Sequence, residues 1–437
     1  MTVLGGFCRI IHLVIRIRLS IVFLVLILPV AVYGQPAITI DTFTSLRGVS
    51  VESQASWLSG GFGRLGSGGD ASGESSEELS GDVRFGIAWD PSDYFGIVVN
   101  GVARSEPGGH QGDDFGLVEG YLEGRLISRN TDVTQPSGRL RLRLGTFFLP
   151  TSRENTDILW TSPYTITLSA INSWVAEEVR PVGLDTDYRI DFPSGNSLAL
   201  GATLFGGNDT SGTLLAWRGW SMHNRLTTYN ETLPLPPLFS LEDSGHFSKQ
   251  RDDGTEPFND DLDDREGWST RARWSNDDRM LLQLTWLDNR GDRRLYRGEY
   301  AWDTDFLHFA AEYRPYLDTV IAHEWMSGST GMGDLVRVHL DYDAWYFMVS
   351  RRFGRWRATI RYDDFETTDR DEGPAETNTE NGRAVTLAAF WETTPSLRVG
   401  LEYVDLSADR VAAAESGFDP NTDGSTITAE VRYYWGR

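Results

Sequence analysis

Arginine and leucine alternate three times in the run Arg139-Leu140-Arg141-Leu142-Arg143-Leu144. In a β-strand, side chains point alternately to the two faces of the sheet, so this run places three guanidinium groups on one face and three leucines on the other. Such a strand needs water on one side and apolar surroundings on the other. A soluble sandwich and a membrane barrel with a wet interior both satisfy that requirement, and similar alternation recurs to the end of the chain.

The first 34 residues have the organisation of a secretory signal peptide. Residues 1–18 carry three arginines and no acid, residues 19–28 are apolar except for Ser20, and the expected cut follows Gly34. The alternative is an uncleaved anchor, but the apolar run is shorter than the roughly 20 residues that a helix needs to cross a bilayer. The only cysteine, Cys8, lies in this segment, so disulfides and thiolate metal sites are not expected in the mature chain.

The charge balance is strongly acidic. The chain has 40 basic and 63 acidic residues and a net charge of −23, and removal of residues 1–34 with their three arginines would make it −26. Nucleic acid is therefore not an expected partner. An anionic solute would need a local basic path, because the overall field repels it.

About sixteen segments alternate in this way, and most have the roughly 9–11 residues expected of a tilted membrane-spanning strand. They are residues 48–58, 79–89, 94–104, 114–126, 139–149, 179–190, 197–207, 266–275, 279–289, 298–314, 318–327, 335–350, 355–366, 383–392, 396–406 and 425–435. Tight turns largely alternate with long connections. The long connections are residues 59–78, 150–178, 208–265, 367–382 and 407–424.

The sorting of connections by length decides between the two architectures. Outer-membrane barrels have short periplasmic turns and longer external loops, whereas a soluble sandwich has no reason to separate them by end. Aromatic residues also gather beside the short turns, as in an interfacial girdle. They are Trp89, Tyr94, Phe95, Trp274, Phe353, Trp356, Trp391, Tyr433 and Trp435. The sequence predicts an all-β fold, a transmembrane antiparallel β-barrel of about sixteen strands over residues 35–437, in the bacterial outer membrane.

The cost of exposing a charged side chain to lipid predicts which face of each strand points inward. An arginine on the lipid face near the bilayer midplane costs about 2–4 kcal/mol, so the arginines of alternating strands should line the lumen. The predicted pore-lining residues are Arg139, Arg141, Arg143, Arg271, Arg273, Arg337, Arg355, Arg357 and Arg361. In residues 335–350 the same argument turns His339, Asp341 and Asp343 inward, with Val336, Val338, Leu340 and Tyr342 toward lipid. In the last strand it turns Thr428, Glu430 and Arg432 inward.

Residues 150–178 form the third external loop in this count and carry many apolar side chains. Exposure of such a patch is unfavourable, so we expect the loop to fold inward against the wall and narrow the pore. Its acids would then face the arginines of residues 139–143 and create a transverse field. The predicted constriction residues are Glu154, Asp157, Trp160, Tyr164, Trp174, Glu177 and Glu178. The alternative is a latch that holds the wall, or a subunit contact.

The mature chain resembles Gram-negative outer-membrane porins, in which the third loop folds into the pore as a constriction. The run from Gly145 through Pro150 and Glu154 to Asn155 also resembles the strand-to-loop passage of the phosphate-selective porin O and P family. That family implies lysines beside an arginine ladder, whereas Lys249 is the only lysine of this chain. Porins commonly end in an aromatic assembly signal; here Tyr433, Tyr434 and Trp435 are followed by Gly436 and Arg437.

The acids of residues 208–265 could bind calcium or the divalent ions that bridge lipopolysaccharide. Their spacing does not match an EF-hand, so a solvated acidic loop is expected and no metal or cofactor is assigned. None of the six histidines that follow the signal peptide lies in a nucleophile-elbow or zincin motif, so no catalytic residue is predicted and the protein is not expected to be an enzyme.

These observations predict an outer-membrane channel for passive diffusion of small hydrophilic solutes. An anion-, phosphate- or acidic-glycan-selective channel is one alternative, and a plugged barrel that acts as an outer-membrane enzyme or adhesin is another. The expected partners are outer-membrane lipid, lipopolysaccharide and the solutes themselves, with assembly into a homotrimer left open.

Overall fold

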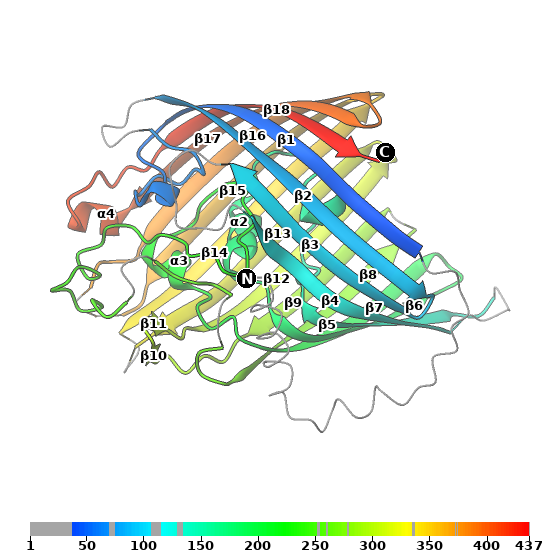
Figure 1. The fold of residues 1–437 in the computed structure, drawn as a ribbon, viewed down its shortest axis with the longest axis horizontal. Helices are drawn as coiled ribbons and strands as arrows, with labels where there is room; N and C mark the ends of the chain where they lie inside the picture. Colours follow the sequence, from blue (N-terminus) through cyan, green and yellow to red (C-terminus); the bar gives the residue numbers. More distant parts are fainter. Residues whose placement is uncertain are drawn as a thin grey trace.

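The structure is a computed structural model that describes residues 37–69, 75–105, 115–128, 134–250, 254–258, 261–277, 279–333, 337–371, 373 and 375–436. The predicted signal peptide lies outside these residues. Sixteen antiparallel strands form one closed barrel, in which β1 pairs with both β18 and β2 (Figure 1). The predicted fold class is therefore confirmed.

The barrel strands follow the chain order, except that the small hairpin of β10 and β11 lies outside the barrel. The barrel strands are β1 (Ala37–Ser53), β2 (Ser76–Ser92), β3 (Phe95–Ser105), β4 (Phe115–Ser128), β5 (Ser137–Thr146), β6 (Val182–Asp191), β7 (Asn196–Gly206), β8 (Glu266–Asn276), β9 (Met280–Asp288), β12 (Asp303–Tyr316), β13 (Thr319–Met332), β14 (Val338–Phe353), β15 (Trp356–Asp369), β16 (Glu380–Thr394), β17 (Leu397–Arg410) and β18 (Gly424–Trp435). The other elements are β10 (Leu295–Tyr296), β11 (Glu299–Tyr300), the α-helices α2 (Ala170–Glu178), α3 (Thr213–Trp217) and α4 (Val411–Glu415), and the 3₁₀ helices η2 (Trp57–Ser59) and η3 (Ile158–Trp160).

The first strand differs most from its predicted position. Residues 48–58 were expected, but β1 runs over Ala37–Ser53. The chain turns after this strand because Ser56 caps η2 by accepting a hydrogen bond from the backbone NH of Leu58 (3.3 Å), and Trp57 is buried. The early part of β1 is rich in threonine and serine, so its alternation is weak in the sequence.

Connection length separates the two ends of the barrel, as predicted. Six of the connections have two to four residues and lie at one end, which we call the turn end. The longest connections lie at the opposite end, which we call the loop end (Figure 1). Two connections depart from this sorting: residues 129–136, between β4 and β5, lie at the turn end, and the shorter residues 333–337, between β13 and β14, lie at the loop end. The third loop is residues 147–181, between β5 and β6, and the fourth loop is residues 207–265, between β7 and β8.

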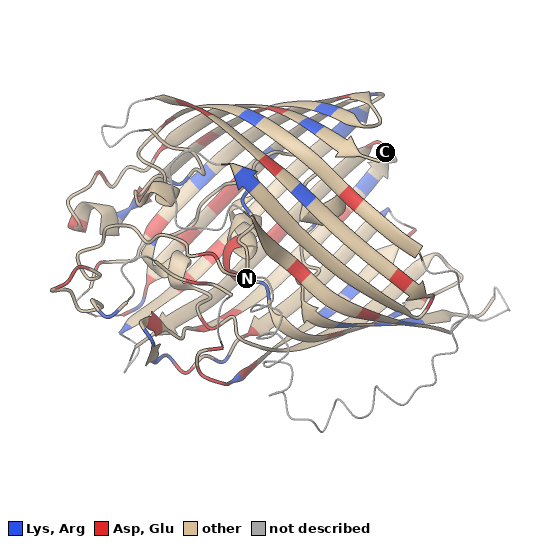
Figure 2. Cartoon of the chain, in the orientation of Figure 1, with Lys and Arg blue, Asp and Glu red and all other residues tan. Residues whose placement is uncertain are grey.

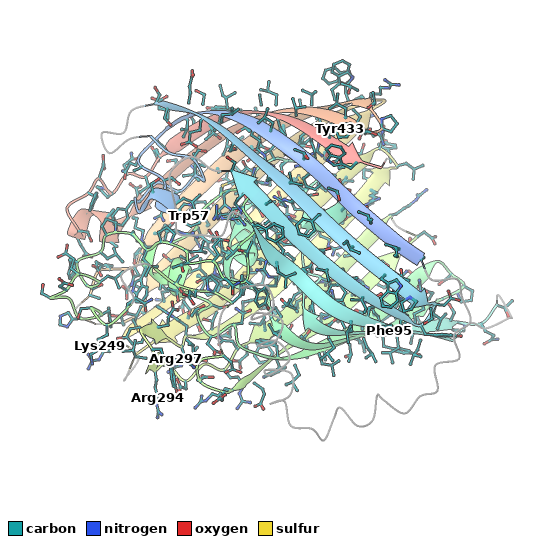
Figure 3. All side chains as sticks on the ribbon, viewed as in Figure 1. Trp57, Phe95, Lys249, Arg294, Arg297 and Tyr433 are labelled. Atoms are coloured by element: carbon teal, nitrogen blue, oxygen red, sulfur yellow. The ribbon has the colours of Figure 1, made fainter. Side chains whose placement is uncertain are left out.

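The outer face of the barrel is largely apolar. In β18, for example, Ile427, Val431 and Tyr433 are exposed, whereas Thr428 and Glu430 are buried on the inner face. Acidic and basic residues recur along the strands and on the long connections (Figure 2). Of the aromatic residues expected in a girdle, Phe95 and Tyr433 lie at the turn end, far from Lys249 at the loop end (Figure 3). A closed sixteen-stranded barrel with this outer face belongs in a bacterial outer membrane. No helix among the described residues has the length and apolarity needed to cross a bilayer.

The predicted facing of β14 is wrong. Val338, Leu340 and Tyr342 are buried on the inner face, so Arg337, His339, Asp341 and Asp343 do not point inward. Val336 lies outside the described residues. The prediction assumed a water-filled lumen, but here the inner face of β14 packs against Trp174 and Trp220 of the loops. On the outer face, Asp341 pairs with Arg370 (2.7 Å), which is possible because the 16-residue strand is longer than a bilayer requires.

Candidate functional site

The third loop leaves the barrel wall at a position that only glycine fits. Gly145, in β5, has a φ of 137°, and a Cβ there would lie 2.2 Å from the carbonyl oxygen of Gly120. Downstream, the side chain of Ser169 accepts a hydrogen bond from the backbone NH of Asn172 (3.2 Å) and caps α2. Local sequence features, a glycine and a serine cap, thus determine where the third loop leaves β5 and where α2 begins.

Inward-facing carboxylates of three strands accept hydrogen bonds from the backbone of the third loop. Glu324 is on β13, Asp363 on β15 and Glu402 on β17. The backbone NH of Arg153 donates to Glu324, and that of Ala170 donates to Asp363 (3.3 Å). The NH groups of Ile166 and Thr167 donate to Glu402 (2.5 and 2.8 Å). These bonds hold the loop against the inner face of β13–β17, and α2 lies beside β13 and β14 (Figure 1).

Glu154 was expected to face the arginines of residues 139–143, but it lies elsewhere. It is fully buried, pairs with Arg361 of β15, and accepts hydrogen bonds from Thr165 Oγ1 (2.9 Å) and from the backbone NH of Ser169 (3.0 Å). Arg361 also pairs with Asp363 (2.7 Å). This carboxylate therefore fixes the loop to the wall and is not available to a solute.

Glu177 and Glu178 join the third loop to the fourth, which also differs from their predicted role. Glu177 pairs with Arg218 (2.6 Å) and with Nε2 of His223 (2.7 Å). Burial raises the pKa of Glu177, but Arg218 and His223 outweigh burial and hold its pKa at about 2. Glu178 accepts hydrogen bonds from the backbone NH groups of Gly212 and Leu214 (both 3.1 Å) at the start of α3. Burial raises the pKa of Glu178 to about 8 despite these bonds.

Aromatic side chains from both loops pack against the inner wall. The Trp174 ring lies 5.4–6.0 Å from the rings of Trp220, Phe306 and Tyr342, all fully buried. Of the other predicted loop aromatics, Trp160 stacks on Phe148 at 4.0 Å and Tyr164 lies 5.2 Å from the Arg357 guanidinium. The buried, mostly apolar run of residues 213–222 in the fourth loop was not predicted, although its leucines and tryptophans were a visible signal.

The arginine run of β5 pairs with neighbouring strands of the wall. Arg143 binds Asp185 of β6 (2.9 Å), and Arg139 binds Asp191 near the turn end (2.5 Å). From β8, Arg271 binds Asp185 and Asp187 (2.6 and 3.2 Å), and Arg273 lies 3.7 Å from Asp187. Arg141 has no ion pair among the described residues, and Arg153 of the third loop is close enough to Arg273 to repel it. The third-loop charge near Arg273 is thus that of Arg153, whereas acids were predicted to face this wall.

A second arginine network on β1, β2, β17 and β18 was only partly predicted. Glu430 pairs with Arg47 (3.0 Å), Arg398 (3.2 Å) and Arg432 (3.0 Å), all nearly buried. Asp82 pairs with Arg47 and with Arg84 (3.1 Å). Arg47 was not predicted to face inward because the first strand was expected to begin at residue 48. Its position between the outward Leu46 and Gly48 was the available signal.

Third-loop residues line two cavities. The loop-end cavity includes Ile166 and Thr167 together with residues of β1, β2 and β18, of the segment 56–67 between β1 and β2, and of the fourth loop. Its ionisable lining residues are Arg47, Glu78, His223 and Arg225. The turn-end cavity includes Asp157 and Pro163 and reaches the short turns. Its ionisable lining residues are Asp157, Arg352, Arg355, Arg357, Glu392, Arg398 and Tyr434. Of the predicted pore-lining residues, only Arg355 and Arg357 line either cavity.

No protein-family model matches the chain, and no curated protein matches it. Among solved structures, it is similar to an anion-selective porin from Comamonas acidovorans, with 11% identity, a TM-score of 0.52 and coverage of 92% of this chain and 100% of that one. It is also similar to the outer-membrane channel DcaP of Acinetobacter baumannii, with 9% identity, a TM-score of 0.50 and coverage of 92% and 98%. At these identities the likeness shows a shared fold, that of Gram-negative outer-membrane porins.

Proposed function

We propose that the protein is an outer-membrane channel for passive diffusion of small hydrophilic solutes, with the third loop as its constriction. The observation that carries this proposal is the position of the third loop between two cavities. Ile166 and Thr167 line the cavity at the loop end, whereas Asp157 and Pro163 line the one at the turn end. A solute that crosses the barrel would pass this loop.

The lining charges favour anions. The turn-end cavity has four arginines against Asp157 and Glu392, and the loop-end cavity has two arginines against Glu78. This basic path lies within a chain of net charge −23, so local charges and not the overall field would set the preference. The solved anion-selective porin of similar fold supports the same direction. Phosphate specificity rests only on the short resemblance around residues 145–155, so small anions in general are the proposed class.

Planar-bilayer recordings of the refolded protein in a salt gradient test the proposal. We expect conductance and a reversal potential on the anion side. The double variant Arg355→Gln, Arg357→Gln should move the reversal potential toward cations, because both arginines line the turn-end cavity and neither forms an ion pair among the described residues. Arg383→Gln is the matched control, since Arg383 is exposed on the outer face of β16. Cation preference in the unmodified protein would refute the anion part.

A plugged barrel that acts as an adhesin or enzyme is the second candidate. It is favoured by the apolar packing of the fourth loop against the wall, where Leu215, Trp217 and Trp220 are fully buried. Correctly folded protein without any conductance would support this candidate and refute the channel.

A further inference from the structure

Three carboxylates meet where the fourth loop leaves and re-enters the barrel. Asp209 lies just after β7, and Asp261 and Asp263 lie just before β8. Each offers a carboxylate oxygen, and these oxygens lie within 4.8 Å of one another. Gly206 and Glu266, at the ends of β7 and β8, are paired in the sheet, so the three acids sit on top of this strand pair.

Asp209 is the buried member and is only partly satisfied. It is 2% exposed, and the backbone NH of Leu262 donates a hydrogen bond to its Oδ2 (2.5 Å). Its Oδ1 has no hydrogen-bond partner. Among the described residues, no arginine, lysine or histidine forms an ion pair with any of the three acids, and Arg265, which lowers the pKa of Asp263, donates through Nη1 to the carbonyl oxygen of Arg290. A buried carboxylate oxygen with no donor is unfavourable unless a cation binds it.

We propose that Asp209, Asp261 and Asp263 bind a calcium ion that fastens the two ends of the fourth loop together. Calcium lies about 2.3–2.6 Å from its oxygen ligands, so two ligands of one ion can be up to roughly 5 Å apart, as these oxygens are. An all-oxygen donor set selects a hard cation over zinc or copper. Calcium fits better than magnesium because it tolerates irregular geometry, with water completing its ligands.

The surrounding contacts extend the effect of such an ion beyond the fourth loop. The carbonyl oxygen of Asp209 accepts a hydrogen bond from the backbone NH of Trp302 (2.6 Å), and the Asp263 carboxylate accepts one from the NH of Asp292 (2.7 Å). Both donors belong to the connection between β9 and β12. The adjacent Asn208 bonds through its side chain to the backbone of Glu178 and Arg180 in the third loop. The ion would therefore brace a junction of three loops.

Burial and the charges of Asp263 and Asp261 raise the pKa of Asp209 to about 8, and burial raises that of Asp261 to about 6. The three neighbouring carboxylates therefore disfavour one another's charged forms, and a bound cation would offset this repulsion.

Terbium luminescence in the refolded full barrel tests the site, with terbium as the probe and calcium as its competitor. Trp302, bonded to Asp209 through its backbone, is a nearby sensitiser. We expect saturable binding that Asp209→Asn abolishes and Asp261→Asn weakens by at least about tenfold, since even changes beyond the ligands cost roughly 10–100-fold in metal affinity. Asp243→Asn, an exposed acid of the same loop, should leave binding unchanged.

Two outcomes would overturn the proposal: no saturable, calcium-sensitive signal in the unmodified protein, or an unchanged signal in Asp209→Asn. If Asp209→Asn does not fold, calcium binding is compared in Asp261→Asn and Asp263→Asn. Both positions are only partly buried, so neither substitution removes a fully buried group. Unaltered calcium affinity in both of these variants would refute the site. The test does not depend on conductance, so it stands apart from the proposed channel function.

Discussion

The inner wall over β13–β17 and the inner wall over β5–β8 use charge in different ways. On β13–β17, carboxylates such as Glu324 and Glu402 point inward and accept hydrogen bonds from the third-loop backbone. On β5–β8, arginines point inward and pair with aspartates of the adjacent strands. The inward carboxylates of β13–β17 therefore hold the third loop, whereas the arginine charge of β5–β8 is only partly neutralised by aspartates of the same wall. The third-loop acids Glu154 and Glu177 already pair with Arg361 and Arg218, so they do not neutralise the arginine side.

Among the tests of this comparison, Arg361→Met should have the largest effect on the free energy of unfolding. Arg361 is fully buried between Glu154 of the loop and Asp363 of the wall, so its removal leaves two buried carboxylates without a cation. Breaking a buried pair in this way should lower the free energy of unfolding by about 3–5 kcal/mol. Urea titration of the refolded protein, followed by tryptophan fluorescence, measures the change. A loss below about 1 kcal/mol would mean that the loop is held by other contacts.

A smaller effect is expected from pH, through the two adjacent acids of α2. The pKa of Glu178 is raised to about 8, so the folded protein keeps a proton that the unfolded chain loses above the usual value of 4.5. Its contribution to stability should therefore decline as the pH rises from 4.5 to about 8. Glu177, with a pKa of about 2, should contribute stability above 4.5 and lose it as the pH falls toward 2.

Glu178→Gln separates these contributions. Unfolding titrations between pH 5 and pH 8 in the presence of a calcium chelator should show a flatter decline for this variant than for the unmodified protein, because other groups such as Asp209 titrate in both. Equal slopes would indicate that Glu178 does not retain its proton in the folded state.

The smallest effect should come from Arg139→Gln. The Arg139 side chain is 51% exposed, and its pair with Asp191 lies near the turn end. Solvated pairs contribute little, so the free energy of unfolding should change by less than about 1 kcal/mol. The same urea titration serves, with Arg361→Met as the contrast. A loss as large as that of Arg361→Met would remove the distinction between the two sides of the wall.

Much of the barrel could be predicted because its strands obey a local rule. The period of two marks each strand, and turn residues mark the short connections, so sixteen strands and the sorting of loops by end were predicted correctly. Side-chain facing followed for β18, where apolar and polar residues separate cleanly. It failed for β14, because alternation alone gives two faces and does not say which one points inward. There the decision depended on whether water or Trp174 occupied the lumen.

The loop partners could not be predicted for a similar reason. Glu154 and Arg361 are 207 residues apart, and Glu402 bonds to the loop backbone from 236 residues away. Nothing local to Glu154 distinguishes an anchor from a lumen-facing charge. The sequence by itself determined a barrel with one apolar face, short turns and a third loop too apolar to be solvated. Only the tertiary structure decided where that loop's charges lie, because burying a carboxylate is favourable only where distant donors converge on it.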